Sequence, residues 1–288
     1  MKIMLLGETG QVAFELRRTL SLLGELAVYN RREADLEDGL ALQKAVRESR
    51  PKIIVNAAAY TAVDRAEEEP ERAGLVNATA PGILAEEARK LNALLVHYST
   101  DFIFDGAKKT PYTEKDNPRP LNVYGQTKLE GERNIRAAGS PHLIFRTAWV
   151  YGIRGKNFLV TMRRLAREKK ELRVVNDQVG APTWCRMIAE ATALVLSKIK
   201  DDRVDLADTY HLTAGGETSW YGFARAIFNR DYGSEKQQVS LNPISTDEYP
   251  TLAKRPLYSV LSSEKVFRNF GVTLPDWEHG LDLAVESN

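Results

Sequence analysis

Short apolar runs alternate with helically spaced apolar residues through the first half of the chain. Residues 2–6 are almost entirely apolar, and Phe14, Leu16, Leu20 and Leu23 then recur at helical spacing. We expect further buried strands at residues 26–30, 53–61, 94–101 and 142–146, with helices at 39–49 and 72–91 and after residue 121. This alternation predicts an α/β protein with a Rossmann-type doubly wound parallel sheet, covered by helices on both faces.

The pattern changes after residue 150. We expect helices at residues 158–169, 184–199, 218–230, 262–270 and 276–286, with strands at 172–176 and 210–213. We therefore divide the chain into residues 1–150 and a smaller lobe of residues 151–288, with part of 180–200 packing on the first domain. No repeat, low-complexity tract or Gly/Ser-rich linker separates them, so we expect the lobes to be interleaved.

Composition narrows the function class. The chain has 288 residues and a formal net charge of +1, without a basic stripe or a polybasic segment. This pattern argues against nucleic acid or a membrane surface as a partner. The apolar run at residues 2–6 is too short for a signal-peptide core, and Cys185 is the only cysteine. We expect a reduced, cytoplasmic protein in which Cys185 is a small buried side chain.

A glycine turn follows the first strand. Residues 7–13 read G-E-T-G-Q-V-A, with the predicted helix beginning directly afterwards. Gly7 and Gly10 would let the backbone approach a pyrophosphate, and the helix start offers free N–H groups to it. The spacing differs from the usual G-x-G-x-x-G, and an ordinary turn is the alternative. Its place at the start of a βα series favours dinucleotide binding.

The end of the second strand bears on the choice of dinucleotide. About twenty residues after the glycine turn, NAD-specific folds place an acid that binds the ribose 2′-hydroxyl. This chain has Asn30, Arg31 and Arg32 there. Guanidinium groups pair with a 2′-phosphate, which favours NADPH over NADH. The alternative, that both arginines are solvated, is almost as good; Asp35 and Leu36 would then bracket the adenine.

A tyrosine and a lysine are four residues apart in Y-G-Q-T-K, residues 124–128. On a helix they lie one turn apart, and a nearby lysine cation would lower the pKa of the Tyr124 phenol. Such a tyrosine passes protons to or from an alcohol or carbonyl oxygen, while a nicotinamide carries the hydride. Thr100, at the end of the fourth strand, would bond the same oxygen. The pattern alone is weak, because Tyr124 and Lys128 also suit an ordinary helix start. We interpret His97 as a packed core histidine.

With these positions in order, the chain resembles the extended short-chain dehydrogenases/reductases, and among them the dTDP-4-dehydrorhamnose reductases. The matching stretches are G-E-T-G-Q-V (7–12), V-N-A-A-A-Y-T-A-V-D (55–64), H-Y-S-T-D-F-I-F (97–104), L-N-V-Y-G-Q-T-K-L-E-G-E (121–132), R-T-A-W-V-Y (146–151), N-D-Q-V-G-A-P-T (176–183), Y-P-T-L-A-K-R-P (249–256) and L-P-D-W-E-H-G (274–280).

The resemblance implies a reaction and a set of site residues. Residues 1–150 would bind NADPH, or NADH, and residues 151–288 would mainly bind the sugar nucleotide. The C4 ketone of dTDP-4-dehydro-β-L-rhamnose would be reduced to dTDP-L-rhamnose, the last step of dTDP-rhamnose biosynthesis, with Thr100, Tyr124 and Lys128 as catalytic residues. Cofactor contacts would come from Gly7, Gly10, Gln11, Val12, Asn30, Arg31, Asp35, Leu36, Ala58, Ala59, Tyr60, Thr61, Tyr98, Tyr124 and Lys128. Substrate contacts would come from Thr100, Asp101, Trp149, Gln178 and Arg255.

Two departures from the family pattern leave alternatives open. Asn30 stands where an acid is usual, so both NADPH and NADH remain in view. Some family members bind magnesium through glutamates at a dimer contact. Glu15 matches one of them, but Arg186 occupies another position, so we expect no metal and either a monomer or a homodimer. Two other functions compete: a sugar-nucleotide epimerase or other reductase, and a non-catalytic regulatory subunit of the same fold.

Overall fold

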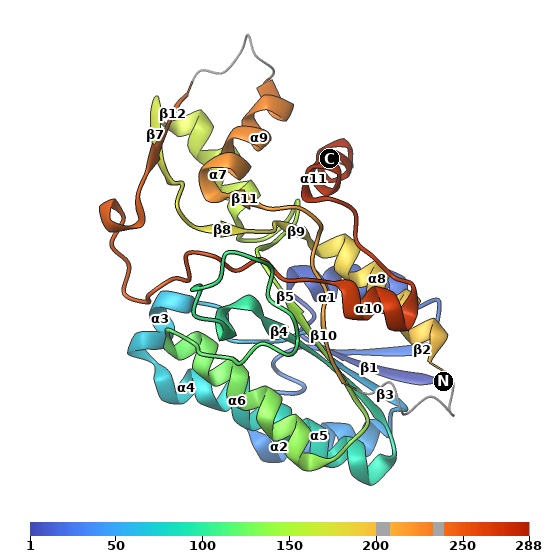
Figure 1. Ribbon diagram of the computed structural model, residues 1–288. Helices are drawn as coiled ribbons and strands as arrows, with labels where there is room; N and C mark the ends of the chain where they lie inside the picture. Colours follow the sequence, from blue (N-terminus) through green and yellow to red (C-terminus); the bar gives the residue numbers. More distant parts are fainter. Residues whose placement is uncertain (200–207, 233–238, 288) are drawn as a thin grey trace.

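A parallel sheet forms the centre of the molecule. The computed structural model describes residues 1–199, 208–232 and 239–287 (Figure 1). The central strands are β1 (Lys2–Leu6), β2 (Glu25–Tyr29), β3 (Ile53–Asn56), β4 (Leu94–Thr100), β5 (His142–Thr147) and β10 (Asp208–His211). They lie in the order β10-β5-β4-β3-β1-β2, and all neighbours are parallel. Because β2 and β3 flank β1 on opposite sides, a ligand crevice is expected at the carboxyl ends of β1 and β3.

Helices cover both faces of this sheet, as predicted. One layer contains α1 (Gln11–Leu20), α8 (Cys185–Lys198) and α10 (Glu264–Phe270), and the other contains α2 (Gly39–Ser49), α5 (Ala80–Leu91) and α6 (Val123–Ala138). Alternate residues of β1 enter different cores: Ile3 and Leu5 pack with the first layer, and Met4 and Leu6 with the second. A strand buried on both faces is apolar throughout, which explains the uninterrupted run in the sequence.

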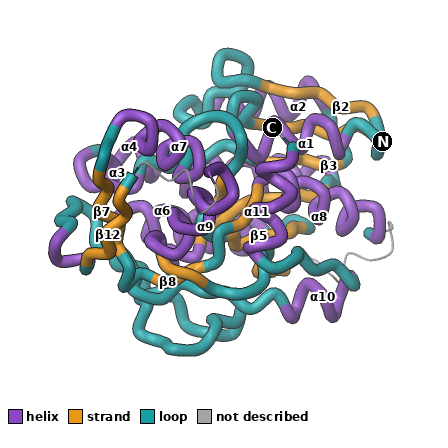
Figure 2. Tube along the Cα trace, turned by 90° about the horizontal axis from the view of Figure 1, so that it is seen from above, coloured by secondary structure: helices purple, strands orange, loops and turns teal. Residues whose placement is uncertain are grey.

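A smaller lobe follows β5. Its elements are β6 (Val150–Tyr151), α7 (Phe158–Glu168), β7 (Glu171–Val175), β8 (Val179–Gly180), β9 (Thr183–Trp184), β11 (Thr218–Ser219), α9 (Trp220–Tyr232), β12 (Ser240–Ile244), the 3₁₀ turn η4 (Thr246–Glu248) and α11 (Trp277–Glu286). It has an apolar core of its own, built around side chains of α7, α9 and α11. Figures 1 and 2 both show its β7–β12 pair far from the N-terminus.

The second half of the chain contributes elements to the central sheet. The strand β10 comes from beyond residue 150 and pairs with β5, and α8 packs on α1 in the core of the central sheet. The boundary at residue 150 stays a prediction. In the part of the chain that the structure describes, no helix combines the length and apolar character needed to cross a membrane.

The helix expected at residues 72–91 is interrupted. It consists of α4 (Pro70–Gly74), the π-helical turn η1 (Leu75–Thr79) and α5, preceded by the short helix α3 (Val63–Glu68). The buried Asn77 side chain lies in the π turn, where it accepts from the Tyr60 N–H at 2.9 Å and donates to the Tyr60 carbonyl at 3.0 Å. These contacts hold the loop after β3 in place, and sequence periodicity does not reveal them.

A buried ion pair joins α6 to the sheet. Arg146 of β5 donates through Nε and Nη2 to the two carboxylate oxygens of Glu132, at 2.9 and 2.7 Å. The side chains are 4% and 0% exposed, so neither charge has water as an alternative partner. Arg146 holds the pKa of Glu132 below its ordinary value of 4.5, although burial acts in the opposite direction.

Replacement of Arg146 by Met should therefore destabilise the fold by about 3–5 kcal/mol, because it leaves a buried carboxylate without its main partner. Urea unfolding at pH 7 measures the loss. Since the folded-state pKa of Glu132 lies below 4.5, the contribution of the pair is full above that pH and disappears as the pH falls through the folded-state value.

Arg133→Met is the matched control on the same helix. Arg133 pairs with Glu130 at 3.3 Å, but their side chains are 63% and 51% exposed. Its loss should cost less than about 1 kcal/mol. Equal losses for the two variants would contradict this account of the buried pair.

Candidate active site

A cavity of about 860 Å³ lies where the crevice was expected. Its walls include the ends of β1 and β4 and the loops after β2 and β3, while the smaller lobe contributes Lys156, Trp220 and Arg255. The predicted site residues that line it are Gly7, Gly10, Gln11, Val12, Asn30, Arg31, Asp35, Leu36, Ala58, Ala59, Tyr60, Thr61, Tyr98, Thr100, Asp101, Tyr124, Lys128, Trp149 and Arg255.

The glycine turn lies against the loop after β3. Gly7 has φ +100°, and a Cβ there would stand 2.9 Å from the Ala58 nitrogen. Only glycine fits this close approach without strain. Gly10 donates to the Gly7 carbonyl at 2.9 Å and precedes the first residue of α1. The turn therefore directs the start of α1, with its free N–H groups, at the cavity.

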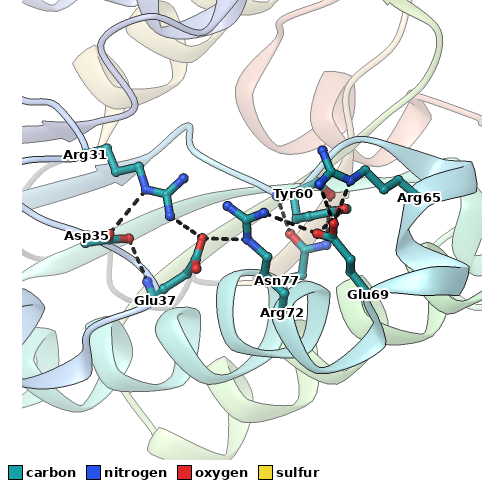
Figure 3. Close-up of polar contacts among 8 residues, drawn as sticks. All are labelled: Arg31, Asp35, Glu37, Tyr60, Arg65, Glu69, Arg72 and Asn77. Atoms are coloured by element: carbon teal, nitrogen blue, oxygen red, sulfur yellow. Dashed lines mark hydrogen bonds and ion pairs between the residues drawn. The ribbon is translucent and has the colours of Figure 1, made fainter.

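Arginines and carboxylates alternate along one end of the cavity (Figure 3). Arg31 donates to Asp35 at 3.2 Å and to Glu37 at 2.5 Å, and Glu37 also accepts from Arg72 at 3.0 Å. Arg72 continues to Glu69, which also accepts from Tyr60 and Arg65. Each guanidinium is thus paired internally, yet the side chain of Arg31 remains 60% exposed.

This network changes the expectation that Arg31 and Arg32 both face the cofactor site. Arg31 lines the cavity, while the neighbouring Arg32 does not. Asn30 uses its side chain locally, accepting from the Arg32 backbone N–H at 2.9 Å. The second arginine at this end of the cavity is instead Arg72, which sequence reasoning missed, together with Glu37. Glu37 and Arg72 are 35 positions apart and meet only in the folded protein, so their spacing in the sequence does not predict the contact.

Tyr124 and Thr100 meet at the other end of the cavity. Thr100 ends β4, and Tyr124 lies in the first turn of α6. Burial raises the pKa of the Tyr124 phenol to about 12, and its hydrogen bond with Thr100 acts against this. The expectation that Lys128 lowers this pKa is wrong for this structure. Tyr124 is therefore a protonated phenol at neutral pH, the form that can donate a proton.

The Lys128 side chain points to β4. Its side chain is 1% exposed, and Nζ donates to the Tyr98 carbonyl at 2.6 Å and lies 3.1 Å from His97 Nε2. Burial lowers the pKa of the Lys128 amine to about 8, with Glu132 acting against it. The ordinary four-residue spacing placed Lys128 beside Tyr124, but β4 offers the polar groups that a buried amine requires.

Two tryptophans form a wall of the cavity. Trp149 stacks on Trp220 with ring centroids 3.5 Å apart and an angle of 3° between the planes. Trp149 has φ +46°, a left-handed backbone that costs energy in a bulky residue. A Cβ at Gly180 would lie 2.4 Å from its ring, so the strand β8 is shaped to this side chain. Trp220, at the start of α9, was not predicted.

The remaining predicted substrate residues differ in their placement. Arg255 lines the cavity and donates to Asp64 at 2.7 Å. Asp101 also lines it, and burial raises the pKa of its carboxyl to about 6. Gln178 lies outside the cavity wall, 7% exposed, with its amide donating to Thr246 at 3.1 Å.

Glu15 has arginines as partners. It is 5% exposed in its side chain, accepts from Arg186 at 3.1 Å and lies 3.6 Å from Arg18. Two guanidinium groups occupy the position where a cation would have to approach this carboxylate. Among the described residues, no three His, Cys, Asp or Glu side chains gather in a way that could hold a metal ion.

Proteins similar in sequence to this chain over almost its whole length include several reductases. A relative from Burkholderia thailandensis, a dTDP-4-dehydrorhamnose reductase, is 47% identical and covers 99% of this chain and 98% of its own length. A protein of the same name from Escherichia coli is 46% identical, covering 98% of this chain and 96% of its own.

Solved structures similar to this chain include a reductase of the same name. The dTDP-4-dehydrorhamnose reductase from Bacillus anthracis, in complex with NADP, superposes with a TM-score of 0.92 at 33% identity and covers 100% of this chain and 99% of its own. A UDP-glucose 4-epimerase from Thermus thermophilus shares the fold, with a TM-score of 0.82 at 21% identity over 99% of this chain and 98% of its own. The family model described as RmlD substrate binding domain matches residues 1–288. The chain belongs to the RmlD substrate binding domain family.

Proposed function

We propose that this protein is a dTDP-4-dehydrorhamnose reductase that uses NADPH to reduce the C4 ketone of dTDP-4-dehydro-β-L-rhamnose. The product is dTDP-L-rhamnose. The observation that carries the proposal is the placement of Tyr124 and Thr100 in the same cavity as the glycine turn, in a chain 47% identical over 99% of its length to a reductase of that name.

The residues around the glycine turn fit a dinucleotide. The absence of a Cβ at Gly7 and the start of α1 leave a concave surface of backbone N–H groups for a diphosphate. A nicotinamide dinucleotide supplies the hydride when bound there. Arg31, in the loop after β2, and Arg72, on α4, line the part of the cavity where the adenine ribose of a Rossmann-bound dinucleotide is expected.

Tyr124 acts as the proton donor. Hydride addition turns a ketone oxygen into an alkoxide, and the buried phenol gives it a proton over a short hydrogen bond. Thr100 lies within hydrogen-bond reach of the Tyr124 hydroxyl, and its single O–H, which donates to Asp101 at 3.1 Å in the ligand-free protein, turns to the substrate oxygen as charge develops on it. A pKa of about 12 in the ligand-free protein keeps the phenol protonated, as reduction requires.

Other residues bind and orient the two ligands. Lys128 holds the hydroxyls of the nicotinamide ribose. Asp101, Trp149 and Arg255 contact the sugar nucleotide, with the Trp149 face as a platform and Arg255 beside the substrate diphosphate. Gln178 reaches the substrate only after release from Thr246. The other proposed cofactor contacts are Gln11, Val12, Asn30, Asp35, Leu36, Ala58, Ala59, Tyr60, Thr61 and Tyr98.

Replacement of Tyr124 by Phe should lower kcat by about 10²–10⁴-fold, because the variant lacks the proton donor but retains the ring. The KM for NADPH should stay within about twofold, since the dinucleotide-binding loop is unchanged. Oxidation of NADPH with dTDP-4-dehydro-L-rhamnose, followed at 340 nm, measures both.

Tyr112→Phe is the control for loss of a buried tyrosine hydroxyl. Tyr112 is 3% exposed and donates to Asp105 at 3.0 Å, outside the cavity wall. Its kcat should equal that of the wild type. A Tyr124→Phe enzyme with wild-type kcat would exclude this residue as the donor.

Arg31→Ala should raise the KM for NADPH by about 5–30-fold and leave the KM for NADH within about twofold. A charge-assisted bond to the 2′-phosphate accounts for about 1–2 kcal/mol, and NADH has no such group. Steady-state kinetics with the two cofactors at saturating sugar nucleotide give the ratio.

The neighbouring Arg32→Ala serves as the control, because Arg32 carries the same charge and does not line the cavity. It should change the two KM values by similar small factors. If Arg31→Ala raised both KM values equally, the residue would not recognise the 2′-phosphate.

A further inference from the structure

A chain of hydrogen bonds runs through the buried region between the cofactor loop and Lys128. The Ala58 backbone N–H lies 3.2 Å from Asn56 Oδ1, and Asn56 Nδ2 lies 3.2 Å from His97 Nδ1. His97 Nε2 in turn lies 3.1 Å from Lys128 Nζ. Asn56, His97 and Lys128 are each 1% exposed, so water does not supply alternative partners.

The Ala58 backbone N–H determines which atoms donate and which accept along this series of hydrogen bonds. A backbone N–H can only donate, so the atom of Asn56 that faces Ala58 must be the carbonyl oxygen. The NH₂ group of the same amide therefore faces His97 Nδ1 and donates to it. Because Nδ1 accepts, it carries no proton.

The protonation of His97 Nε2 and of Lys128 Nζ follows from this. A neutral imidazole with a free Nδ1 carries its proton on Nε2, which then donates to Lys128 Nζ. An ammonium group has no lone pair with which to accept, whereas a neutral amine has one. The same nitrogen donates one of its own protons to the Tyr98 carbonyl at 2.6 Å. The contacts are thus those of a neutral lysine.

The surroundings of Lys128 do not all favour the neutral amine. Burial lowers the pKa of both the lysine amine and His97, which keeps the imidazole neutral. Glu132 favours the ammonium but is already paired with Arg146. The titratable groups of the packed elements around this region are Asp101 of the turn η2 (Asp101–Ile103), Tyr124 and Glu132 of α6, and Arg146 of β5, whereas the Tyr98 phenol bonds Thr192 of α8.

We propose that Asn56 and His97 are positioning residues that hold Lys128 as a neutral amine in the cofactor-free protein at mildly alkaline pH, so that binding of a nicotinamide dinucleotide at that pH takes up a proton at Lys128 Nζ. This inference rests on the proposed function, in which Lys128 binds the nicotinamide ribose. An ammonium offers three N–H groups, which match the Tyr98 carbonyl and two ribose hydroxyls. The anionic diphosphate of the cofactor favours the added charge as well.

The proton is balanced as follows. Lys128 changes from –NH₂ to –NH₃⁺ with one proton from solvent, and the His97 proton is exchanged from Nε2 to Nδ1 without a net change. With Nδ1 protonated, the Asn56 amide must present its oxygen to His97 and loses its bond to the Ala58 N–H. Since Ala58 lines the cavity beside Gly7, the charge of Lys128 is linked to the loop that binds the cofactor.

The first test needs neither a variant nor a cofactor. The chain has four histidines, so ¹⁵N long-range NMR can assign each imidazole by single substitution. At pH 9 we expect a neutral His97 ring with the proton on Nε2. A proton on Nδ1 at that pH would overturn the proposal, because His97 would then accept from Lys128.

The second test is calorimetric titration of the full chain with NADP⁺ in buffers of different ionisation enthalpy. Wild type at pH 8.5 should take up between about one half and one proton per site. Because the bound form has the higher lysine pKa, the contribution to affinity is full below pH 8 and decreases as the pH rises above it. The Kd should rise by up to about tenfold per pH unit in that range.

Asn56→Asp reverses the direction of the hydrogen-bond chain with an isosteric side chain. Its carboxylate accepts from both the Ala58 N–H and a His97 Nδ1–H, which leaves Nε2 to accept from a charged lysine. Proton uptake should decrease to less than about 0.2 per site, and His97→Gln should reduce it as well. The matched control is His211→Gln, since His211 is 0% exposed but lies outside the cavity wall; its uptake should equal that of the wild type.

The outcomes separate the two proposals. NADP⁺ binding without proton uptake by the wild type would overturn the role of Asn56 and His97 and leave the reductase proposal intact. Equal uptake by wild type and Asn56→Asp would overturn it too. If neither NADP⁺ nor NAD⁺ bound, the proposed function would fail, and the His97 tautomer would still decide whether Lys128 is held neutral.

Discussion

The close approach of α6 to its neighbours determines the chemistry of this protein. A Cβ at Gly125 would lie 2.2 Å from the Phe102 carbonyl oxygen, and one at Gly131 would lie 2.1 Å from the Asn77 carbonyl oxygen. Both distances are shorter than any side chain tolerates, so glycine is required at two turns of the same helix. With α6 so close, Tyr124 reaches Thr100 and Lys128 reaches the backbone of β4.

Burial then sets the acid–base properties of the groups that α6 brings to the cavity. It raises the pKa of Tyr124 to about 12 and lowers that of Lys128 to about 8, so both groups tend toward their neutral forms. A protonated phenol is useful to a reductase, whose donor must hold a proton when hydride arrives. The simple idea of a lysine cation acting on a phenolate omits this effect, because it treats both groups as if they were in water.

The parts of this structure that depend on local patterns could be predicted from the sequence. The strands of the central sheet, the glycine turn and α2 follow from apolar periodicity and from glycines at a βα turn. The predicted site residues line the cavity, with the exception of Gln178. Each of these features involves residues close together in the chain or at equivalent strand ends.

Features that depend on tertiary contacts were missed. The π turn forms because Asn77 bonds the backbone of Tyr60, 17 positions away. Glu37 binds Arg72 across 35 positions, and the His97 ring meets Lys128 across 31. In the sequence, His97 looks like a core histidine, and the structure does bury it. Its direction toward α6 depends on the side of β4 that faces the helix, so its partner becomes visible only when the layers are assembled.

At both ends of the cavity, basic side chains are held by partners within the protein. At one end Arg31 and Arg72 are held by Glu37, and at the other Lys128 is held by Tyr98 and His97. These internal partners keep the basic side chains ordered before a ligand arrives, which reduces the conformational entropy lost on binding. In the proposed complex they would also compete with the ligand, because a 2′-phosphate would share guanidinium donors with Glu37. The acid near the adenine ribose would then be Glu37 and not the residue that follows β2. Its charge would weaken the preference for NADPH that the arginines alone would create.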